Sequence, residues 1–254
     1  MFLFFAIKLA KGVSYMKIGE NIEAIFFDLD GTLLPLDQFD FLKQYFRAIT
    51  AFAVEHGISS DKFSAGMVAG IEAMTNNDGS KTNMETYWEV FCAVSALDRS
   101  FVEDTLAEFY ADGFKKLREF TNPNPLAVEA LRAARKNGRK VVLATSPVFP
   151  EFVQLERLSW IGLSKDDFDL VTNYENSNFC KPHSEYYLEI CQKIGVAPEN
   201  CLMIGNDEND DMRGASKAGM SCFLVTDHRI LSDHFVWTGE RGTFEQMVHL
   251  IERI

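Results

Sequence analysis

The feature that most constrains the fold is an alternation of short apolar runs with longer helical stretches, which continues from residue 121 to the end of the chain. These runs cover residues 140–144, 168–171, 201–204 and 222–225, and an earlier run covers 22–27. Runs of β-branched or apolar residues separated by helical segments are typical of strand–helix units in a parallel sheet. The sequence therefore predicts an α/β fold built on a parallel sheet.

The predicted helices between these strands have recognisable ends. Asn124-Pro125 supplies a capping residue followed by a first-turn proline, and Lys136-Asn137-Gly138 supplies a stop signal before the next strand. Three more segments have helical periodicity, namely residues 184–194, 208–218 and 243–254. The last of them is expected to close the chain as a helix.

Residues 36–120 have a different pattern from the rest of the chain. They contain no β-branched run, and apolar residues recur at helical spacing, as in Phe39, Leu42 and Phe46. The segment 121–125 follows with two prolines, which disfavour continuation of a helix. We therefore expect an all-helical insert that leaves the sheet near Pro35 and returns through this linker.

These patterns divide the chain into parts. An N-terminal stretch is apolar but has no basic leader, and it is far shorter than the roughly 20 apolar residues that a membrane span needs. Its status stays open, since translation could start at Met16 as well as at Met1. The predicted parts are an extension of residues 1–16, an α/β core of residues 17–35 and 121–254, and a helical cap of residues 36–120.

The composition limits the class of partner. The chain has 37 acidic and 25 basic residues, and the resulting net charge of −12 repels nucleic acid and anionic membranes. Its five cysteines include no CxxC pair, which favours a reducing cytoplasm. We therefore expect a cytoplasmic protein that binds a small molecule and neither nucleic acid nor membrane. The oligomeric state is left open.

Polar clusters follow the predicted strands. In a parallel sheet the carboxyl ends of the strands share one edge, so residues that are distant in sequence meet in one crevice there. Each cluster alone is ordinary, because Asp-Gly is a common turn and Asn-Asp a common helix cap. Their combination in this order is specific: Asp28 and Asp30, then Thr145-Ser146, then Lys181-Pro182, and then Gly205-Asn206-Asp207 with Asp211.

This ordered set resembles the four motifs of the haloacid dehalogenase (HAD) superfamily of phosphohydrolases. The resemblance covers the chain from about Asn21 onwards. It implies a Rossmann-like parallel sheet with helices on both faces, and a helical cap of the C1 type inserted after the first motif. The stretch of about 35 residues between the second and third motifs leaves little room for an α/β cap. The implied activity is that of a phosphoric monoester hydrolase.

The acidic residues predict a metal site. Asp28, Asp30 and Asp207 crowded into one cleft would repel one another unless a hard cation with a preference for oxygen lies among them. The resemblance implies that this cation is Mg²⁺. It would be held by a carboxylate oxygen of Asp28, the main-chain carbonyl of Asp30 and the carboxylate of Asp207. Asp211 would either lie in the outer coordination sphere or orient Lys181.

The resemblance also implies a mechanism. Asp28 would attack phosphorus to form an aspartyl phosphate, which water then hydrolyses. Asp30 would protonate the leaving alkoxide and later accept a proton from water. Thr145 and Lys181 would bind the phosphoryl group.

The remaining predicted substrate contacts are less specific. Main-chain amides after Asp28, around Gly31 and Thr32, would help to bind the phosphate, and Gly31 allows the chain to turn sharply. Ser146 stands where the family often has asparagine, so its expected contact with substrate rests on position alone.

The sequence leaves alternatives to a magnesium-dependent phosphatase acting on a small phosphate ester. Dehalogenases of this superfamily lack the second aspartate of the first motif, because a halide leaves without a proton, so Asp30 favours an oxygen leaving group. A phosphomutase of the same superfamily stays open, as does phosphonate hydrolysis with a cap lysine. A contrasting class is a non-catalytic binding or regulatory protein that retains the fold.

Overall fold

The computed structural model of the protein describes residue 18 and residues 21–254. The predicted extension of residues 1–16, and the choice between Met1 and Met16, lie outside the described residues. In the part of the chain that is described, no helix is both long enough and apolar enough to cross a membrane.

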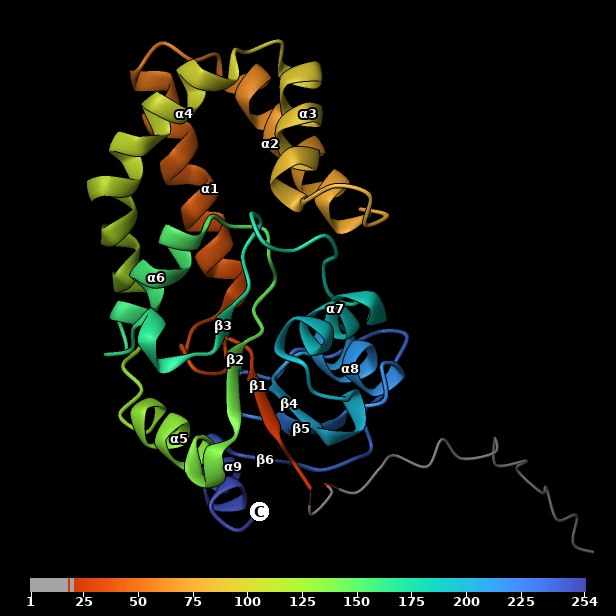
Figure 1. Cartoon of the computed structure of the whole chain (residues 1–254). Helices are drawn as coiled ribbons and strands as arrows, with labels where there is room; N and C mark the ends of the chain where they lie inside the picture. The colour runs from red at the N-terminus through yellow and green to blue at the C-terminus, as the bar shows by residue number, and fades with distance from the viewer. Residues whose placement is uncertain (1–17, 19–20) are drawn as a thin grey trace, which may run out of the picture.

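A six-stranded sheet, parallel throughout, forms the framework of the α/β core (Figure 1). The strand order is β3-β2-β1-β4-β5-β6, so the chain runs outward from β1 to β3 and then crosses to β4 on the other side of β1. Ligands of open α/β sheets bind outside the carboxyl ends of the strands at such a reversal. The strands are β1 (Ala24–Phe27), β2 (Lys140–Leu143), β3 (Leu170–Val171), β4 (Cys201–Gly205), β5 (Ser221–Val225) and β6 (Arg241–Gly242).

Helices cover both faces of this sheet, which explains why its central strands are apolar throughout. Alternate residues of β1 belong to two separate apolar clusters: Ile25 and Phe27 face one side, and Ala24 and Phe26 face the other. The first face packs against α5 (Ala127–Ala134), α6 (Glu151–Ser159) and α9 (Phe244–Ile251), and the second against α7 (Ser184–Ile194) and α8 (Gly214–Lys217).

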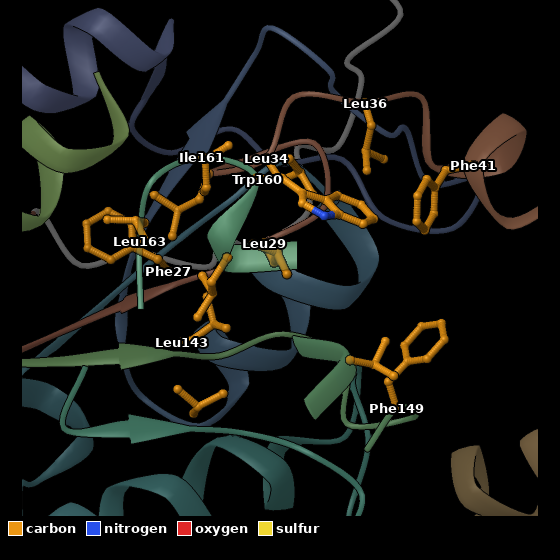
Figure 2. Packing of buried hydrophobic residues seen from close by; sticks show 14 of the residues in the cluster. Phe27, Leu29, Leu34, Leu36, Phe41, Leu143, Phe149, Trp160, Ile161 and Leu163 are labelled. Atoms are coloured by element: carbon orange, nitrogen blue, oxygen red, sulfur yellow. The ribbon is translucent and has the colours of Figure 1, made fainter. Parts of the chain in front are cut away.

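The named elements between β1 and α5 are all helices or helical turns, and they stand above the sheet in Figure 1. Its apolar residues join the cluster on the first face of the sheet. Phe41 and Trp160 meet edge to face with ring centroids 6.3 Å apart, and Leu36 lies beside them (Figure 2). The elements of this insert are α1 (Gln38–Glu55), α2 (Ser60–Thr75), α3 (Asn83–Ser95), α4 (Arg99–Glu108), a π-helical turn η1 (Phe109–Gly113) and a 3₁₀ segment η2 (Phe114–Phe120).

The two chain crossings between the insert and the sheet lie side by side. Asn122 N donates a hydrogen bond to Pro35 O at 2.8 Å, and Asn124 Nδ2 donates to Leu33 O at 2.8 Å. The insert is therefore joined to the core by two chain segments that lie side by side, around residues 33–35 and 122–124. Such a connection is suited to a hinge, a role that stays a prediction for residues 35 and 121–125.

The fold class predicted from the sequence is confirmed: a Rossmann-like parallel sheet carries helices on both faces, together with a helical cap. Several element limits were wrong. The first strand begins at Ala24 rather than at residue 22, the third covers only Leu170–Val171, and β6 was missed. The single helix expected over 208–218 is a π-helical turn followed by the short α8. The domain limits themselves remain predictions.

Candidate active site

The end of strand β1 brings Asp28 into contact with Lys181. Lys181 Nζ donates hydrogen bonds to Asp28 Oδ1 at 2.7 Å and to Asp211 Oδ1 at 2.6 Å, so the ammonium group lies between two carboxylates. All three side chains are buried. A buried charge is tolerated where opposite charges and hydrogen bonds compensate for its lost hydration. Asp28, Lys181 and Asp211 thus form one buried charge cluster, although 153 residues separate the first two.

The loop after β4 is shaped by its contacts with Asp211. Asp211 Oδ2 accepts a hydrogen bond from Asp207 N at 3.0 Å, and a Cβ atom on Gly205 would lie only 2.1 Å from the same oxygen. Only glycine at position 205 leaves room for this carboxylate. Asp207 Oδ1 in turn accepts from the amides of Asn209 and Asp210, at 2.7 and 2.8 Å. Asp207 therefore caps the π-helical turn η6 (Glu208–Arg213).

Burial and repulsion raise the pKa of three carboxyl groups of the site, those of Asp28, Asp207 and Asp211. Burial raises the pKa of Asp28 to about 7, with Asp211 and Asp30 adding to the rise and Lys181 opposing it. Burial also raises the pKa of both Asp207 and Asp211 to about 6. Burial disfavours the charged form of Lys181, but Asp211 and Asp28 outweigh it and hold its pKa well above the ordinary value. An additional cation near the acids would relieve their repulsion.

Asp30 pairs with Arg157, a residue that the sequence analysis missed. Arg157 Nη1 donates to both carboxylate oxygens of Asp30, at 2.8 and 2.7 Å, and the arginine side chain is only 1% exposed. Its guanidinium group also donates to Gln154 Oε1 and lies 4.9 Å from the centroid of the Phe149 ring. These contacts fix the position of Asp30 at the edge of the site. An arginine on an amphipathic helix is normally expected in solvent, so no pattern in the sequence predicts this pair.

The first-motif loop is fastened to the loop after β4. Gly31 has a φ of +80°, and a Cβ atom there would lie 2.3 Å from Asn206 Nδ2. Thr32 Oγ1 donates to Asn206 Oδ1 at 3.0 Å, and Asn206 Nδ2 donates to His228 O at 2.6 Å. The Thr32 hydroxyl therefore links two loops. The predicted contacts of Gly31 and Thr32 with substrate stay predictions.

The Thr145-Ser146 cluster follows strand β2, next to Asp28. Ala144 N donates to Phe27 O at 2.7 Å, which aligns the ends of the two strands. Thr145 is buried, and its carbonyl accepts hydrogen bonds from Tyr186 Oη and Thr172 Oγ1, both at 2.8 Å. Ser146 is half-buried. The main chain at Thr145 is thus firmly held, while the phosphate-binding role of its hydroxyl and of Ser146 remains predicted.

The donor set at this edge suits a small, hard cation. Among the described residues, no group of three or more Asp, Glu, His or Cys side chains is arranged to hold one metal ion. The predicted ligands do not require such a group, because they are the carboxylates of Asp28 and Asp207 and one main-chain carbonyl at Asp30. Mg²⁺ is commonly bound by one or two carboxylates and keeps several waters. The raised pKa values of Asp28 and Asp207 also fit a site that a cation would stabilise.

Comparison with known proteins identifies the family to which this chain belongs. The family model of haloacid dehalogenase-like hydrolases matches residues 22–219, which is most of the chain. The chain therefore belongs to the haloacid dehalogenase-like hydrolases. This confirms the family and the hydrolase class that the motifs predicted.

Individual relatives are phosphatases. The chain is 26% identical to the phosphorylated carbohydrates phosphatase of Thermotoga maritima over 203 residues, which cover 78% of this chain and 82% of that protein. It is 24% identical over 201 residues to the glyceraldehyde 3-phosphate phosphatase of Methanopyrus kandleri, with 78% and 82% coverage. The crystal structure of a HAD phosphatase from Thermococcus onnurineus has the same fold, with a TM-score of 0.57, 21% identity, and coverage of 92% of this chain and 100% of that one.

Proposed function

We propose that the protein is a Mg²⁺-dependent phosphatase that hydrolyses a small phosphomonoester through an aspartyl phosphate on Asp28. The observation that carries this proposal is the contact of Lys181 with Asp28 and Asp211 at the carboxyl edge of the sheet. A carboxylate nucleophile must approach an anionic phosphate, and a fixed cation beside it offsets the repulsion between them. The phosphatases among the relatives support the same activity.

In the first step, a carboxylate oxygen of Asp28 attacks phosphorus, and the bond between phosphorus and the ester oxygen breaks as the new bond forms. Asp30 donates a proton to the leaving alkoxide. In the second step, water attacks the phosphorus of the aspartyl phosphate, Asp30 accepts a proton from this water, and Asp28 is released. Lys181 and the Thr145 hydroxyl bind the phosphoryl oxygens during both steps.

A bound Mg²⁺ ion would neutralise charge on the transferring phosphoryl group. The residues proposed to hold it are Asp28, Asp207 and the main-chain carbonyl of Asp30. Asp211 is proposed to orient Lys181, because the two side chains are in direct contact. Arg157 is proposed to position Asp30 for both proton transfers, since it holds both oxygens of that carboxylate.

Hydrolysis of 4-nitrophenyl phosphate by purified protein tests the proposal. Wild type should turn over the ester with Mg²⁺ and lose activity when the metal is chelated. Asp28→Asn keeps the shape of the side chain but weakens the nucleophile, and it should lose activity by at least about 10³-fold. Glu185→Gln, on the exposed first turn of α7, is a matched control and should retain wild-type activity. Equal activity of wild type and Asp28→Asn would refute the proposed nucleophile.

A further inference from the structure

A cavity of about 360 Å³ lies between the helical insert and the loop after β2. Its walls come from helices α1 to α4 and η1 on one side, and from residues 148–150, 152 and 174 on the other. This size falls in the range of small-molecule sites in proteins. Phe152 lines the cavity and is 53% exposed, so the cavity has a route to solvent.

The walls of the cavity are predominantly aromatic. The hydroxyl groups of Tyr45 and Tyr110 lie 2.8 Å apart and share one hydrogen bond, so one of the two hydroxyl donors is used within the wall. Burial raises the pKa of Tyr174 to about 12, as expected for a hydroxyl in apolar surroundings. The aromatic residues that carry the argument are Tyr45, Tyr87, Trp88, Tyr110, Phe149 and Tyr174.

The cavity offers no positive charge to a bound group. The described residues that line it include no lysine, arginine or histidine, and the one acidic residue among them is Glu103. Arg99 donates to Glu103 Oε1 from Nε and Nη2, at 3.1 and 3.0 Å, so the charge of Glu103 is already balanced. An anionic or cationic group that entered would lose hydration without gaining an unpaired counter-charge.

A chain of contacts connects this cavity to the candidate active site. Phe149 lines the cavity, and its ring packs against the guanidinium group of Arg157. Arg157 in turn holds both oxygens of Asp30. Val148, another lining residue, donates its amide to Ser146 O at 2.9 Å, within the second motif. The cavity therefore lies next to the residues that hold the proposed proton donor, with Phe149 and Arg157 between its wall and Asp30.

We infer that this cavity binds the leaving group of the substrate, and that the leaving group is an uncharged aromatic or apolar alcohol. The inference rests on the proposed phosphatase function and adds the substrate class to it. Burial of an apolar ring among aromatic side chains is favourable. A carboxylate would find no free counter-charge in these walls, and the several hydroxyl groups of a sugar would find Trp88 Nε1 as a buried donor without a partner among the described residues, which is too few to satisfy them. The two relatives described above are named as phosphatases of glyceraldehyde 3-phosphate and of phosphorylated carbohydrates; the inference gives this chain a less polar leaving group than theirs.

A series of esters with similar alkoxide leaving groups tests the inference. 2-Phenylethyl phosphate, glycerol phosphate, phosphoglycolate and phosphocholine differ in the polarity and charge of the alcohol. The value of kcat/KM should be at least about tenfold higher for 2-phenylethyl phosphate than for each of the others, because only its alcohol matches the walls. A preference for glycerol phosphate, phosphoglycolate or phosphocholine would overturn the inference while leaving the phosphatase function intact.

A pair of variants on helix α2 tests whether the leaving group binds in this cavity. Ile71 lines the cavity, and Val68, on the same helix, is 63% exposed and does not line it. Ile71→Lys should lower the ratio of kcat/KM for 2-phenylethyl phosphate over phosphoglycolate by at least about tenfold, because it adds a cation to an apolar wall. Val68→Lys adds the same charge outside the cavity and should leave this ratio unchanged. Equal ratios in the two variants would overturn the assignment of the cavity.

A binding measurement separates this inference from the phosphatase proposal. The non-hydrolysable 2-phenylethylphosphonate should bind wild type in calorimetry and bind Ile71→Lys at least about tenfold more weakly. If no ester is hydrolysed yet the phosphonate binds in this way, the phosphatase function fails while the aromatic specificity of the cavity stands. If esters are hydrolysed but the phosphonate binds both proteins equally, only the cavity inference fails.

Discussion

At the scale of single residues, the most consequential contact is the one between Asp30 and Arg157. The proposed mechanism requires Asp30 to give a proton to the leaving group, and Arg157 determines where that carboxylate lies. Loss of a proton donor matters most when the leaving group is a poor one, since 4-nitrophenolate departs without help and an alkoxide does not. The identity of the leaving group therefore distinguishes a positioning role of Arg157 from a purely structural one.

We predict that Asp30→Asn and Arg157→Leu both lower kcat/KM for an alkyl phosphate by at least about 10²-fold, with a much smaller loss of kcat/KM for 4-nitrophenyl phosphate, because kcat/KM reports the steps up to departure of the leaving group and not the later hydrolysis of the aspartyl phosphate. Steady-state kinetics with the two esters measures this difference. Arg135→Leu removes a half-exposed arginine that pairs with Asp169 and serves as the control. Equal losses on both esters for Arg157→Leu would mean that Arg157 only supports the fold.

Gly205 offers a second test at this scale. We predict that Gly205→Ala displaces the Asp211 carboxylate, because the added Cβ would lie 2.1 Å from its Oδ2, and that activity falls by at least about tenfold. Gly57→Ala introduces a side chain at a φ of +82°, where no atom of the described part of the chain lies within 4 Å of the added Cβ. This variant serves as the control, and its free energy of unfolding should fall by about 1 kcal/mol without loss of activity. Full activity of Gly205→Ala would contradict the role given to Asp211.

At the scale of elements, helix α3 shows how local sequence sets the start of a helix. Thr82 Oγ1 accepts from Glu85 N at 3.2 Å, and Glu85 Oε2 accepts from Thr82 N at 2.9 Å, which is a complete capping box. The hydrogen bonds from the Thr82 amide and hydroxyl lower the pKa of Glu85. A carboxyl group with a lowered pKa in the folded state stabilises the protein above its unfolded pKa and loses that effect as the pH falls through the folded value.

We predict that Thr82→Ala lowers the free energy of unfolding by about 1 kcal/mol near neutral pH. Glu85→Gln should also be less stable than wild type near neutral pH, and the difference should shrink as the pH falls below about 4.5, where the carboxyl group gains its proton. Urea unfolding at several pH values measures both effects. A constant difference between wild type and Glu85→Gln across this range would show that the charge of Glu85 contributes nothing to the cap.

Sequence patterns predicted the elements that obey simple rules. The four long strands, helix α7 at residues 184–194 and the all-helical insert follow from apolar periodicity and from caps. Strand β6 was missed because it has only two residues, Arg241 and Gly242, and no apolar pattern. The contact of Asp28 with Lys181 could be anticipated from strand ends and motif order. The ion pairs of Arg157 with Asp30 and of Glu208 with Arg229 could not. The Arg157 and Glu208 side chains are buried by tertiary packing, which no local sequence pattern indicates.

At the scale of the whole molecule, the arrangement of insert and core suggests that access to the site is controlled by closure. The cavity has walls from both parts, and the two crossings near Pro35 and Asn122 are joined by one backbone hydrogen bond. Water must be excluded during phosphoryl transfer, yet product has to leave, and both needs are met when a cap opens and closes.

We predict that the distance between the cap and the core shortens when a phosphate analogue binds. Spin labels at exposed Val68 on α2 and exposed Leu188 on α7 would report this distance by pulsed electron paramagnetic resonance. The expected result is a broader, longer distribution without the analogue and a narrower, shorter one with it. A single unchanged distance under both conditions would refute gating by closure.

The most direct test of the central claim is to trap the phosphorylated enzyme. Wild-type protein is mixed with 2-phenylethyl phosphate and Mg²⁺, quenched in acid within the first turnover, digested and examined by mass spectrometry. We predict a phosphoryl group on the carboxylate of Asp28, its loss on brief treatment with alkali, and its absence from Asp28→Asn. Release of phosphate by wild type with no phosphorylated peptide, or with the phosphoryl group on another residue, would contradict the account.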